Sequence, residues 1–320
     1  MMSFRKRAPS VVASLFAVVV ASSALAADTF INVLTGGTSG VYYPLGVALG
    51  NAIGKAMPGV KTSVQATKAS VENLNLLQAG RGEIAFTLGD SLSDAWKGSE
   101  DAGFKTPLKK LRGIAAIYPN YIQIVARADS GIKSIADLKG KKISVGAPKS
   151  GTELNARVIF KAAGLEYKDF AKVEYLPFGE SVELMKNRQI DVTLQSAGLG
   201  VSALRDVATS VDIVVVPIPP DVVKKTNDPA YLAATIPANT YRGQTADVPS
   251  AAVQNYLVTH EGVSDDVAYA MTKALWTNLD ALTSAHSAAK AIDPKRALEG
   301  MPVPLHPGAE KYYKETGLIK

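Results

Sequence analysis

From residue 29 onward, short runs rich in β-branched and aromatic residues alternate with longer segments whose apolar residues recur at helical spacing. This alternation is typical of parallel strands joined by crossover helices, so it predicts an α/β protein. Strands are expected at residues 30–34, 62–66, 84–88, 113–118, 122–126, 143–146, 172–176, 191–195, 213–217 and 253–258. Helices are expected at residues 41–56, 71–78, 135–138, 152–163, 181–187, 203–208, 264–281 and 309–316.

The first 26 residues have the three-part layout of a secretory signal peptide. Three cations at residues 5–7 precede an apolar run from Val11 to Val20, and the small residues Ala24-Leu25-Ala26 follow. This layout predicts cleavage after Ala26 and export to the periplasm. The alternative is a membrane anchor, but the apolar run is shorter than the roughly 20 residues that a spanning helix needs.

Composition narrows the possible partners. The chain contains no cysteine, so neither a disulfide nor a lipid attached to cysteine can form, and the fold must be stable through core burial. The formal net charge of +6 includes the three signal-peptide cations, which leaves +3 without a dense Lys/Arg block. This charge predicts no nucleic-acid partner and no stable membrane insertion. The length suggests about two domains.

Three predicted strand-to-helix loops share one chemistry. They are residues 35–40 (Thr-Gly-Gly-Thr-Ser-Gly), 66–70 (Ala-Thr-Lys-Ala-Ser) and 149–152 (Lys-Ser-Gly-Thr). Each combines small residues, hydroxyl groups and the free N–H groups of a helix start, which together can bind an anion. Ser39, Ser70 and Thr152 could equally be plain N-caps. In α/β sheets ligands bind beyond the carboxyl ends of the strands, where such loops lie.

Glycine recurs at four-residue spacing within the first predicted helix, at Gly46, Gly50 and Gly54. We expect these glycines to let the helix pack closely against the sheet. The same spacing occurs at membrane helix dimers, but the intervening Asn51 and Lys55 do not favour a membrane.

The signatures of an enzyme are missing from the sequence. It contains no Gly-x-Ser-x-Gly elbow, no phosphate loop ending in Gly-Lys-Ser/Thr and no Gly-x-Gly-x-x-Gly motif, and its three histidines lack metal-site spacing. Glu72, Asp90 and Glu153 flank the loops and could form an acid/base pair. Glu72 and Glu153, however, lie in first helical turns, which favour carboxylates for structural reasons. We therefore expect no catalysis, no cofactor and no metal.

Several separate motifs resemble one receptor family. Residues 35–44 (TGGTSGVYYP), 69–73 (ASVEN), 134–140 (SIADLKG), 145–155 (VGAPKSGTELN) and 306–309 (HPGA) are similar to the TAXI-type solute receptors of tripartite ATP-independent periplasmic (TRAP) transporters. The resemblance implies a two-lobed periplasmic-binding-protein fold of the second type, with the ligand cleft between the lobes. Lobe one would hold residues 27–120 and 216–320, and lobe two residues 121–215. The chain would cross at residues 118–121 and return near residues 214–220.

The resemblance also implies a function and a set of ligand-facing residues. The lobes would close on a small carboxylate ligand, a glutamate-like amino acid or another organic acid, and deliver it to TRAP membrane permease subunits. Its ligand-facing positions are Thr38, Ser39, Tyr42, Ser70, Val71, Asn73, Asp90, Tyr118, Ser150, Gly151 and Thr152. Lys68, Lys149 and Gln195 depart from the family pattern and indicate a more anionic or more polar ligand, with Gln195 added to the site. The rival interpretations are a receptor of an ATP-driven importer and an exported two-lobed enzyme.

Overall fold

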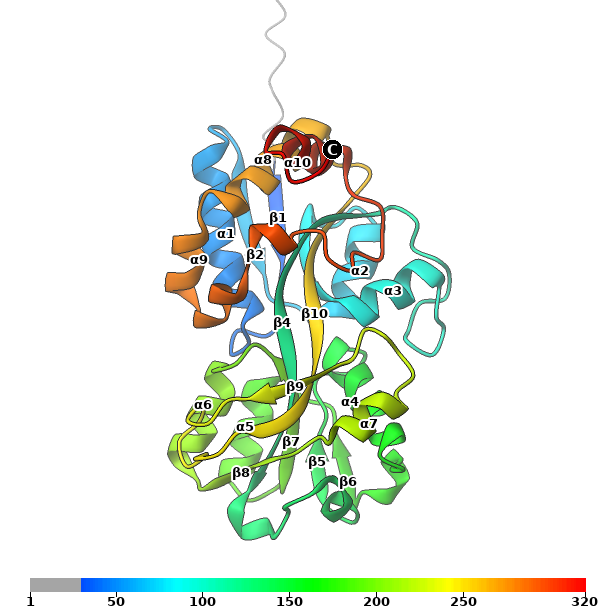
Figure 1. The fold of residues 1–320 in the computed structure, drawn as a ribbon, viewed down its shortest axis with the longest axis vertical. Helices are drawn as coiled ribbons and strands as arrows, with labels where there is room; N and C mark the ends of the chain where they lie inside the picture. The colour runs from blue at the N-terminus through cyan, green and yellow to red at the C-terminus, as the bar shows by residue number, and fades with distance from the viewer. Residues whose placement is uncertain (1–29) are drawn as a thin grey trace, which may run out of the picture.

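The computed structural model describes residues 30–320, so the predicted signal peptide at residues 1–26 lies outside the described residues. Two lobes are connected by two long antiparallel strands, β4 (Leu111–Arg127) and β10 (Val248–His260), which run the length of the molecule (Figure 1). One sheet passes through both lobes in the order β2-β1-β3-β10-β4-β7-β5-β6, and β8 and β9 pair with β4 and β10. Within residues 30–320, no helix is long and apolar enough to cross a bilayer.

Lobe one is built on the parallel strands β1 (Phe30–Leu34), β2 (Lys61–Gln65) and β3 (Ile84–Leu88). Six helices pack around them: α1 (Tyr42–Ala56), α2 (Ser70–Gln78), α3 (Gly89–Lys97), α8 (Asp265–Trp276), α9 (Leu279–Ala285) and α10 (Pro307–Glu315). Two 3-10 turns, Ser287–Ala291 and Pro294–Arg296, precede α10.

Lobe two repeats this arrangement with five short strands. They are β5 (Lys142–Ser144), β6 (Lys172–Glu174), β7 (Val192–Ala197), β8 (Ile213–Val216) and β9 (Leu232–Ile236). Its helices are α4 (Gly151–Ala162), α5 (Phe178–Lys186), α6 (Ser202–Ser210) and α7 (Pro220–Lys225). Three 3-10 turns, Ala128–Ser130, Ile135–Leu138 and Tyr167–Asp169, complete it.

The α/β class predicted from the sequence is confirmed, and parallel strands are present in each lobe, as β1–β3 and as β5–β7. β4 and β10 run antiparallel to their neighbours. The strands predicted at residues 113–118 and 122–126 are one strand, β4, which continues through Pro119. Proline has no N–H to donate to a β ladder, so within a sheet it occurs at edges or bulges. Here β10 shifts its register opposite Pro119, between Gln254 and Tyr256.

Other differences concern elements without a clear periodic pattern. The sequence prediction missed α3, α7 and β9, and the helix expected at residues 264–281 is two helices, α8 and α9. The helices expected at residues 41–56, 71–78 and 152–163 are confirmed to within one residue at each end.

The course of β10 bears on the predicted lobe boundaries. Residues 248–252 pair with β9 in lobe two, whereas residues 255–258 pair with β3 in lobe one. Residues 121–126 of β4 pair with β7 in lobe two. We therefore propose that the chain crosses between the lobes near Asn120 on β4 and near Val253 on β10. On this proposal lobe two extends beyond its predicted end at residue 215, because β10 begins only at Val248.

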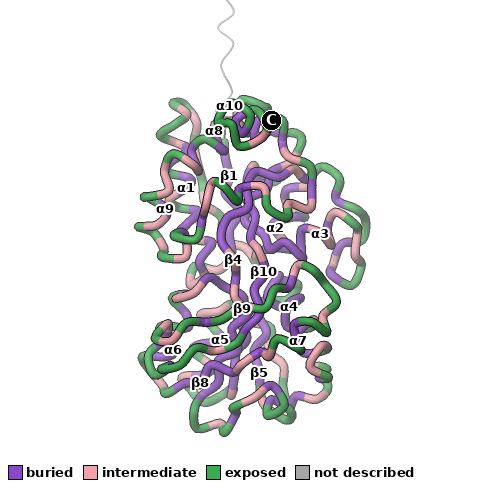
Figure 2. Tube along the Cα trace, viewed as in Figure 1, coloured by how far each residue is buried: buried purple, intermediate pink, exposed green. Residues whose placement is uncertain are grey.

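The hydrophobic core follows the sheet through both lobes, where the central strands are buried (Figure 2). One cluster surrounds β1, α1 and α8, with Leu45, Leu49 and Met271 fully buried. A second cluster fills lobe two around Ile124, Phe160 and Leu194.

The glycines of α1 pack the helix against the sheet, as predicted. A Cβ on Gly46 would overlap Cγ2 of Thr35, whose hydroxyl donates to the Gln65 carbonyl at 2.7 Å and holds the side chain in place. A Cβ on Gly50 would meet its nearest neighbour, Val64, at an ordinary 3.5 Å. The close approach is therefore concentrated at Gly46.

We expect Gly46→Ala and Gly50→Ala to change stability in opposite directions. The first substitution overpacks a held contact and should lower the free energy of unfolding by about 1–3 kcal/mol. The second adds a helix-favouring side chain in open contact and should raise it by up to about 1 kcal/mol. Urea unfolding of both variants checks this, and equal losses in both would contradict it.

Candidate ligand-binding cleft

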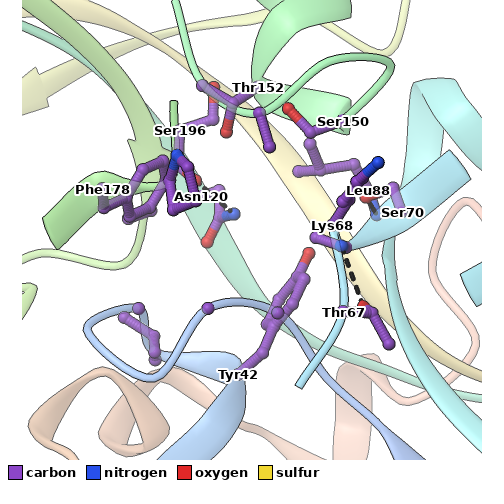
Figure 3. Close-up of a pocket in the computed structure, with 18 of the residues that line it drawn as sticks. Tyr42, Thr67, Lys68, Ser70, Leu88, Asn120, Ser150, Thr152, Phe178 and Ser196 are labelled. Carbon is purple, nitrogen blue, oxygen red and sulfur yellow. Dashed lines mark hydrogen bonds between the residues drawn. The ribbon is translucent and has the colours of Figure 1, made fainter. Parts of the chain in front are cut away.

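A cavity of about 90 Å³ lies between the two lobes, where the ends of several strands and the starts of several helices meet (Figure 3). This volume is several times what a single water requires. Lobe one and β4 contribute Gly36, Gly37, Gly40, Val41, Tyr42, Thr67, Lys68, Ala69, Ser70, Leu88, Tyr118 and Asn120. Lobe two contributes Ala147, Ser150, Thr152, Pro177, Phe178, Ser196 and Ala197.

Lobe one presents two helix starts that carry no side-chain cap. The N-caps of α1 and α2 are Val41 and Ala69, and neither side chain bonds the first helical turn. Ala69 has a φ of 68°, in the left-handed region that a non-glycine residue rarely adopts. N–H groups that lack a cap are available to a ligand, and the helix dipole favours a negative one.

Lobe two closes the cavity with the starts of α4 and α5. Ser150 is the N-cap of α4 and accepts from the Glu153 N–H at 3.2 Å. Gly151 follows it, and a Cβ there would lie 2.6 Å from both Ser70 Oγ and Leu88 Cδ1. Glycine therefore lets the α4 start abut lobe one. The Phe178 ring covers the side of the cavity next to Asn120 (Figure 3).

The hydrogen bonds of the lining hydroxyls determine what they offer a ligand. Ser70 Oγ accepts from the Leu88 N–H at 3.1 Å and Ser150 Oγ accepts from Glu153, which leaves each a proton to donate, and the Ser70 hydroxyl faces that of Tyr42. The Tyr118 hydroxyl is buried and has no partner among the described residues. Burial raises the pKa of Tyr118 well above its ordinary value, so this group stays a neutral hydroxyl with a proton to donate.

The charge of the lining has one sign. Lys68 is its single charged side chain, and no aspartate or glutamate lines the cavity within residues 30–320. Lys68 has no ion-pair partner in this part of the chain, while the Glu72 carboxylate accepts from its backbone N–H at 2.6 Å. The cavity therefore combines donors, uncapped helix starts and one cation.

Five of the predicted positions line the cavity: Tyr42, Ser70, Tyr118, Ser150 and Thr152. Three others lie at contacts between the lobes or beside the cavity. The Ser39 carbonyl accepts from Ser202 Oγ at 2.8 Å, Gly151 abuts Ser70, and Thr38 belongs to the β1–α1 loop without lining the cavity.

The remaining predicted positions lie in the interior. Val71 is packed in the core of lobe one. Asn73 of α2 donates to the carbonyls of Thr35 and Phe86 at 2.7 and 2.9 Å. It therefore connects the start of α2 to the β1–α1 loop and to β3. Gln195 is fully buried on β7, and its amide has no partner among the described residues.

Asp90 holds the lobes together instead of lining the cavity. Its carboxylate accepts from Asn155 Nδ2 of α4 at 2.5 Å and from the Tyr231 hydroxyl at 2.7 Å. Asn155 in turn accepts from Ser196 Oγ at 2.6 Å. Burial raises the pKa of Asp90 to about 6, and the charges of Asp94 and Asp228 add to this, while the bonds from Tyr231 and Ser91 lower it.

The carboxylates that could have formed an acid/base pair have structural partners. Arg157 binds Glu153 through two bonds of 2.6 and 2.5 Å. Within residues 30–320, no group of three or more His, Asp or Glu side chains could hold a metal. His306 is buried and caps α10 by accepting from the Gly308 N–H at 3.2 Å.

Sequence reasoning missed part of the lining, notably Leu88, Asn120 and Phe178. The segment Pro177–Phe178 joins a predicted strand to a predicted helix, so it is a fourth loop of the kind that located the other three. Leu88 and Asn120 lie at or within strands and carry no such signal.

The raised pKa of Asp90 predicts a pH-dependent stability. A carboxyl that is harder to ionise in the folded state adds stability below its unfolded pKa and loses it as the pH rises through about 6. When the pH is raised from 5 to 7.5, the free energy of unfolding of the wild type should fall by about 1 kcal/mol more than that of the Asp90→Asn variant. Urea titrations at the two pH values check this, and parallel losses would contradict it.

Solved structures with the same fold include three that are 12–17% identical to this chain. PhnD1 of Prochlorococcus marinus, in complex with methylphosphonate, has a TM-score of 0.57 at 12% identity over 91% of this chain and all of its own. The alkanesulfonate-binding protein SsuA of Xanthomonas axonopodis, bound to MOPS, scores 0.52 at 12% identity over 91% and 95%. A putative L-cystine ABC transporter protein of Listeria monocytogenes scores 0.50 at 17% identity over 84% and 98%.

These likenesses confirm the predicted two-lobed periplasmic-binding-protein fold. The family follows from the sequence, because residues 33–317, which are nearly all of the described chain, match the NMT1-like family. The protein belongs to the NMT1-like family.

Proposed function

We propose that this chain is a solute receptor of a membrane uptake system, which captures a small organic anion by closing its two lobes. The observation that carries the proposal is the cavity between the lobes, lined by hydroxyl donors and uncapped helix starts around a single cation, Lys68. The predicted signal peptide supports a periplasmic location. Asp90 and Glu153 are engaged in structural bonds, which agrees with a protein that binds its ligand without reacting with it.

The lining can supply enough interaction energy for useful affinity. Ser70, Tyr118, Ser150 and Thr152 offer hydroxyl protons, and the helix starts add N–H groups. At about 1.5–3 kcal/mol for each charge-assisted bond, four or five bonds contribute about 6–15 kcal/mol, and most of this range lies above the roughly 8 kcal/mol of a micromolar complex. The surplus can offset the cost of ordering ligand and lobes.

Closure accounts for the contacts that join the lobes. Gly151 of α4 abuts Ser70 of α2, and Ser202 donates to the Ser39 carbonyl. Both contacts lie beside the cavity, so they can form only when the lobes approach. A ligand bonded to both lobes would stabilise this closed arrangement through its differential affinity for it.

Two classes of permease could receive the ligand. The motifs at residues 35–44 and 145–155 favour TRAP permease subunits and a carboxylate such as a glutamate-like amino acid or another organic acid. The name of the Listeria neighbour favours the rival, an ATP-driven importer, and the methylphosphonate and MOPS bound to the other two are small organic acids with phosphonate and sulfonate head groups. Purification of the receptor with each permease class, in the presence of ligand, distinguishes the two.

A groove beside the cavity supports an anionic ligand. It shares Lys68 with the cavity and adds Lys105 of lobe one and Lys149 of lobe two. The three lysines are exposed and have no ion-pair partner among the described residues, and Glu72 is the one acidic side chain of the groove. A groove with such an excess of positive charge raises the local concentration of anions.

The test of the receptor function is a thermal-shift screen with carboxylates, sulfonates and phosphonates, followed by Tyr118→Phe. A ligand that binds only the folded protein raises the melting temperature. Tyr118→Phe should weaken binding of the best compound about tenfold or more, because a donor is lost. It should leave the ligand-free melting temperature unchanged or raise it, because the hydroxyl has no partner to lose.

Tyr313→Phe is the matched control. Its hydroxyl is buried in lobe one and donates to the Ile114 carbonyl at 2.8 Å, away from the cavity lining. This variant should lower the melting temperature by removing a satisfied bond and should keep the affinity of the wild type. Equal affinities of Tyr118→Phe and wild type in calorimetry would remove Tyr118 from the site.

The lysine groove predicts an effect on association. Lys105→Gln with Lys149→Gln should slow the association of the best anion roughly threefold or more at low ionic strength, with little change in the dissociation rate. The difference should shrink as salt is added. Stopped-flow measurements check this, and Lys290→Gln with Lys295→Gln, which lie outside the groove, is the control of equal charge. Identical slowing in both pairs would contradict a local effect.

A further inference from the structure

We infer that the solute held between the lobes carries an anionic group and no ammonium group, so that amino acids are excluded from the cleft. The inference rests on the proposed receptor function and narrows its ligand class. It depends on which groups line the cavity as donors and which as acceptors.

No carboxylate is positioned to neutralise a ligand ammonium. Four acidic residues lie within two positions of the lining in sequence; Glu180 of α5 is exposed and does not line the cavity, and the other three have partners within the described chain. Asp90 accepts from Asn155 and Tyr231, and Glu153 binds Arg157 through two bonds. The Glu72 carboxylate accepts from the backbone N–H of Lys68. None of the three side chains lines the cavity.

The acceptors that do line the cavity are neutral. The Tyr42 hydroxyl donates to Asn255 Oδ1, and Ser196 Oγ donates to Asn155 Oδ1, so each keeps its lone pairs for a ligand. Asn120 Oδ1 already accepts from Asn255 Nδ2 at 2.8 Å. Such groups can accept from a ligand hydroxyl. A buried ammonium without a counter-charge, however, is strongly unfavourable.

The lining also offers several donors, and for two of them a backbone partner fixes the direction of the hydroxyl proton. Ser70 and Ser150 accept from backbone N–H groups, so their protons are directed elsewhere, that of Ser70 toward the cavity and the Tyr42 hydroxyl. The Tyr118 hydroxyl, which has no partner among the described residues, can donate to a ligand. Lys68 adds a positive charge that would repel an ammonium. The arrangement selects an anion, with room for one or two neutral hydroxyl or carbonyl groups.

Matched pairs of compounds test the inference with the unmodified protein. The two members of each pair differ only in the ammonium group: propionate and L-alanine, glutarate and L-glutamate, ethanesulfonate and 2-aminoethanesulfonate, butanoate and 4-aminobutanoate. Melting temperatures at equal concentrations, and calorimetry for every compound that shifts them, give the ratio of affinities within each pair. The lactate and propionate pair adds a test of the neutral acceptors.

We expect at least one amine-free member to bind, with its amino partner at least tenfold weaker. An amino compound that binds as tightly as its partner would overturn the inference while it supports the receptor function. If no member of any pair binds, the proposed capture of a small organic anion fails, and the inference fails with it.

Discussion

The approach of two helix starts across the cleft is the constraint on which the contact between the two lobes depends. The α4 start reaches the α2 start at Gly151 and Ser70, where any side chain larger than hydrogen would collide with Ser70 and Leu88. The same approach brings the Ser150 and Thr152 hydroxyls opposite Lys68 and Ser70 (Figure 3). In the closure that we propose, approach of the lobes and assembly of the cavity are one event, because both need the same backbone contact.

Beside this contact, the buried polar groups are of two kinds: some join the lobes, and one lines the cavity without a partner in the described chain. Asp90, Asn155 and Tyr231 satisfy one another across the lobes, and their burial is reflected in the raised pKa of Asp90. The Tyr118 hydroxyl, in contrast, is buried without a partner. A polar group that lacks a partner costs stability in the ligand-free protein, and a ligand acceptor would recover that cost on binding.

The sequence predicted the parts of this architecture that arise from local patterns. Alternating strands and helices, the glycine contact of α1 and the loops at residues 35–40, 66–70 and 149–152 all follow from periodicity and loop chemistry. The continuity of β4 through Pro119 could not be predicted, because it depends on a register shift in β10, more than 130 residues later. Asp90 was misplaced for a similar reason, since its partners come from α4 and from the segment before β9.

The same limit explains why the ligand class could be narrowed only with the structure. Serine and tyrosine hydroxyls can donate or accept, so their presence in a loop does not fix the charge of a ligand. The choice is made by distant backbone and side-chain groups: the Leu88 N–H makes Ser70 a donor toward the cavity, and Asn255 makes Tyr42 an acceptor. Related chains that share the loops can thus differ in ligand whenever these partners differ, because the partners set the direction of each hydrogen bond in the cleft.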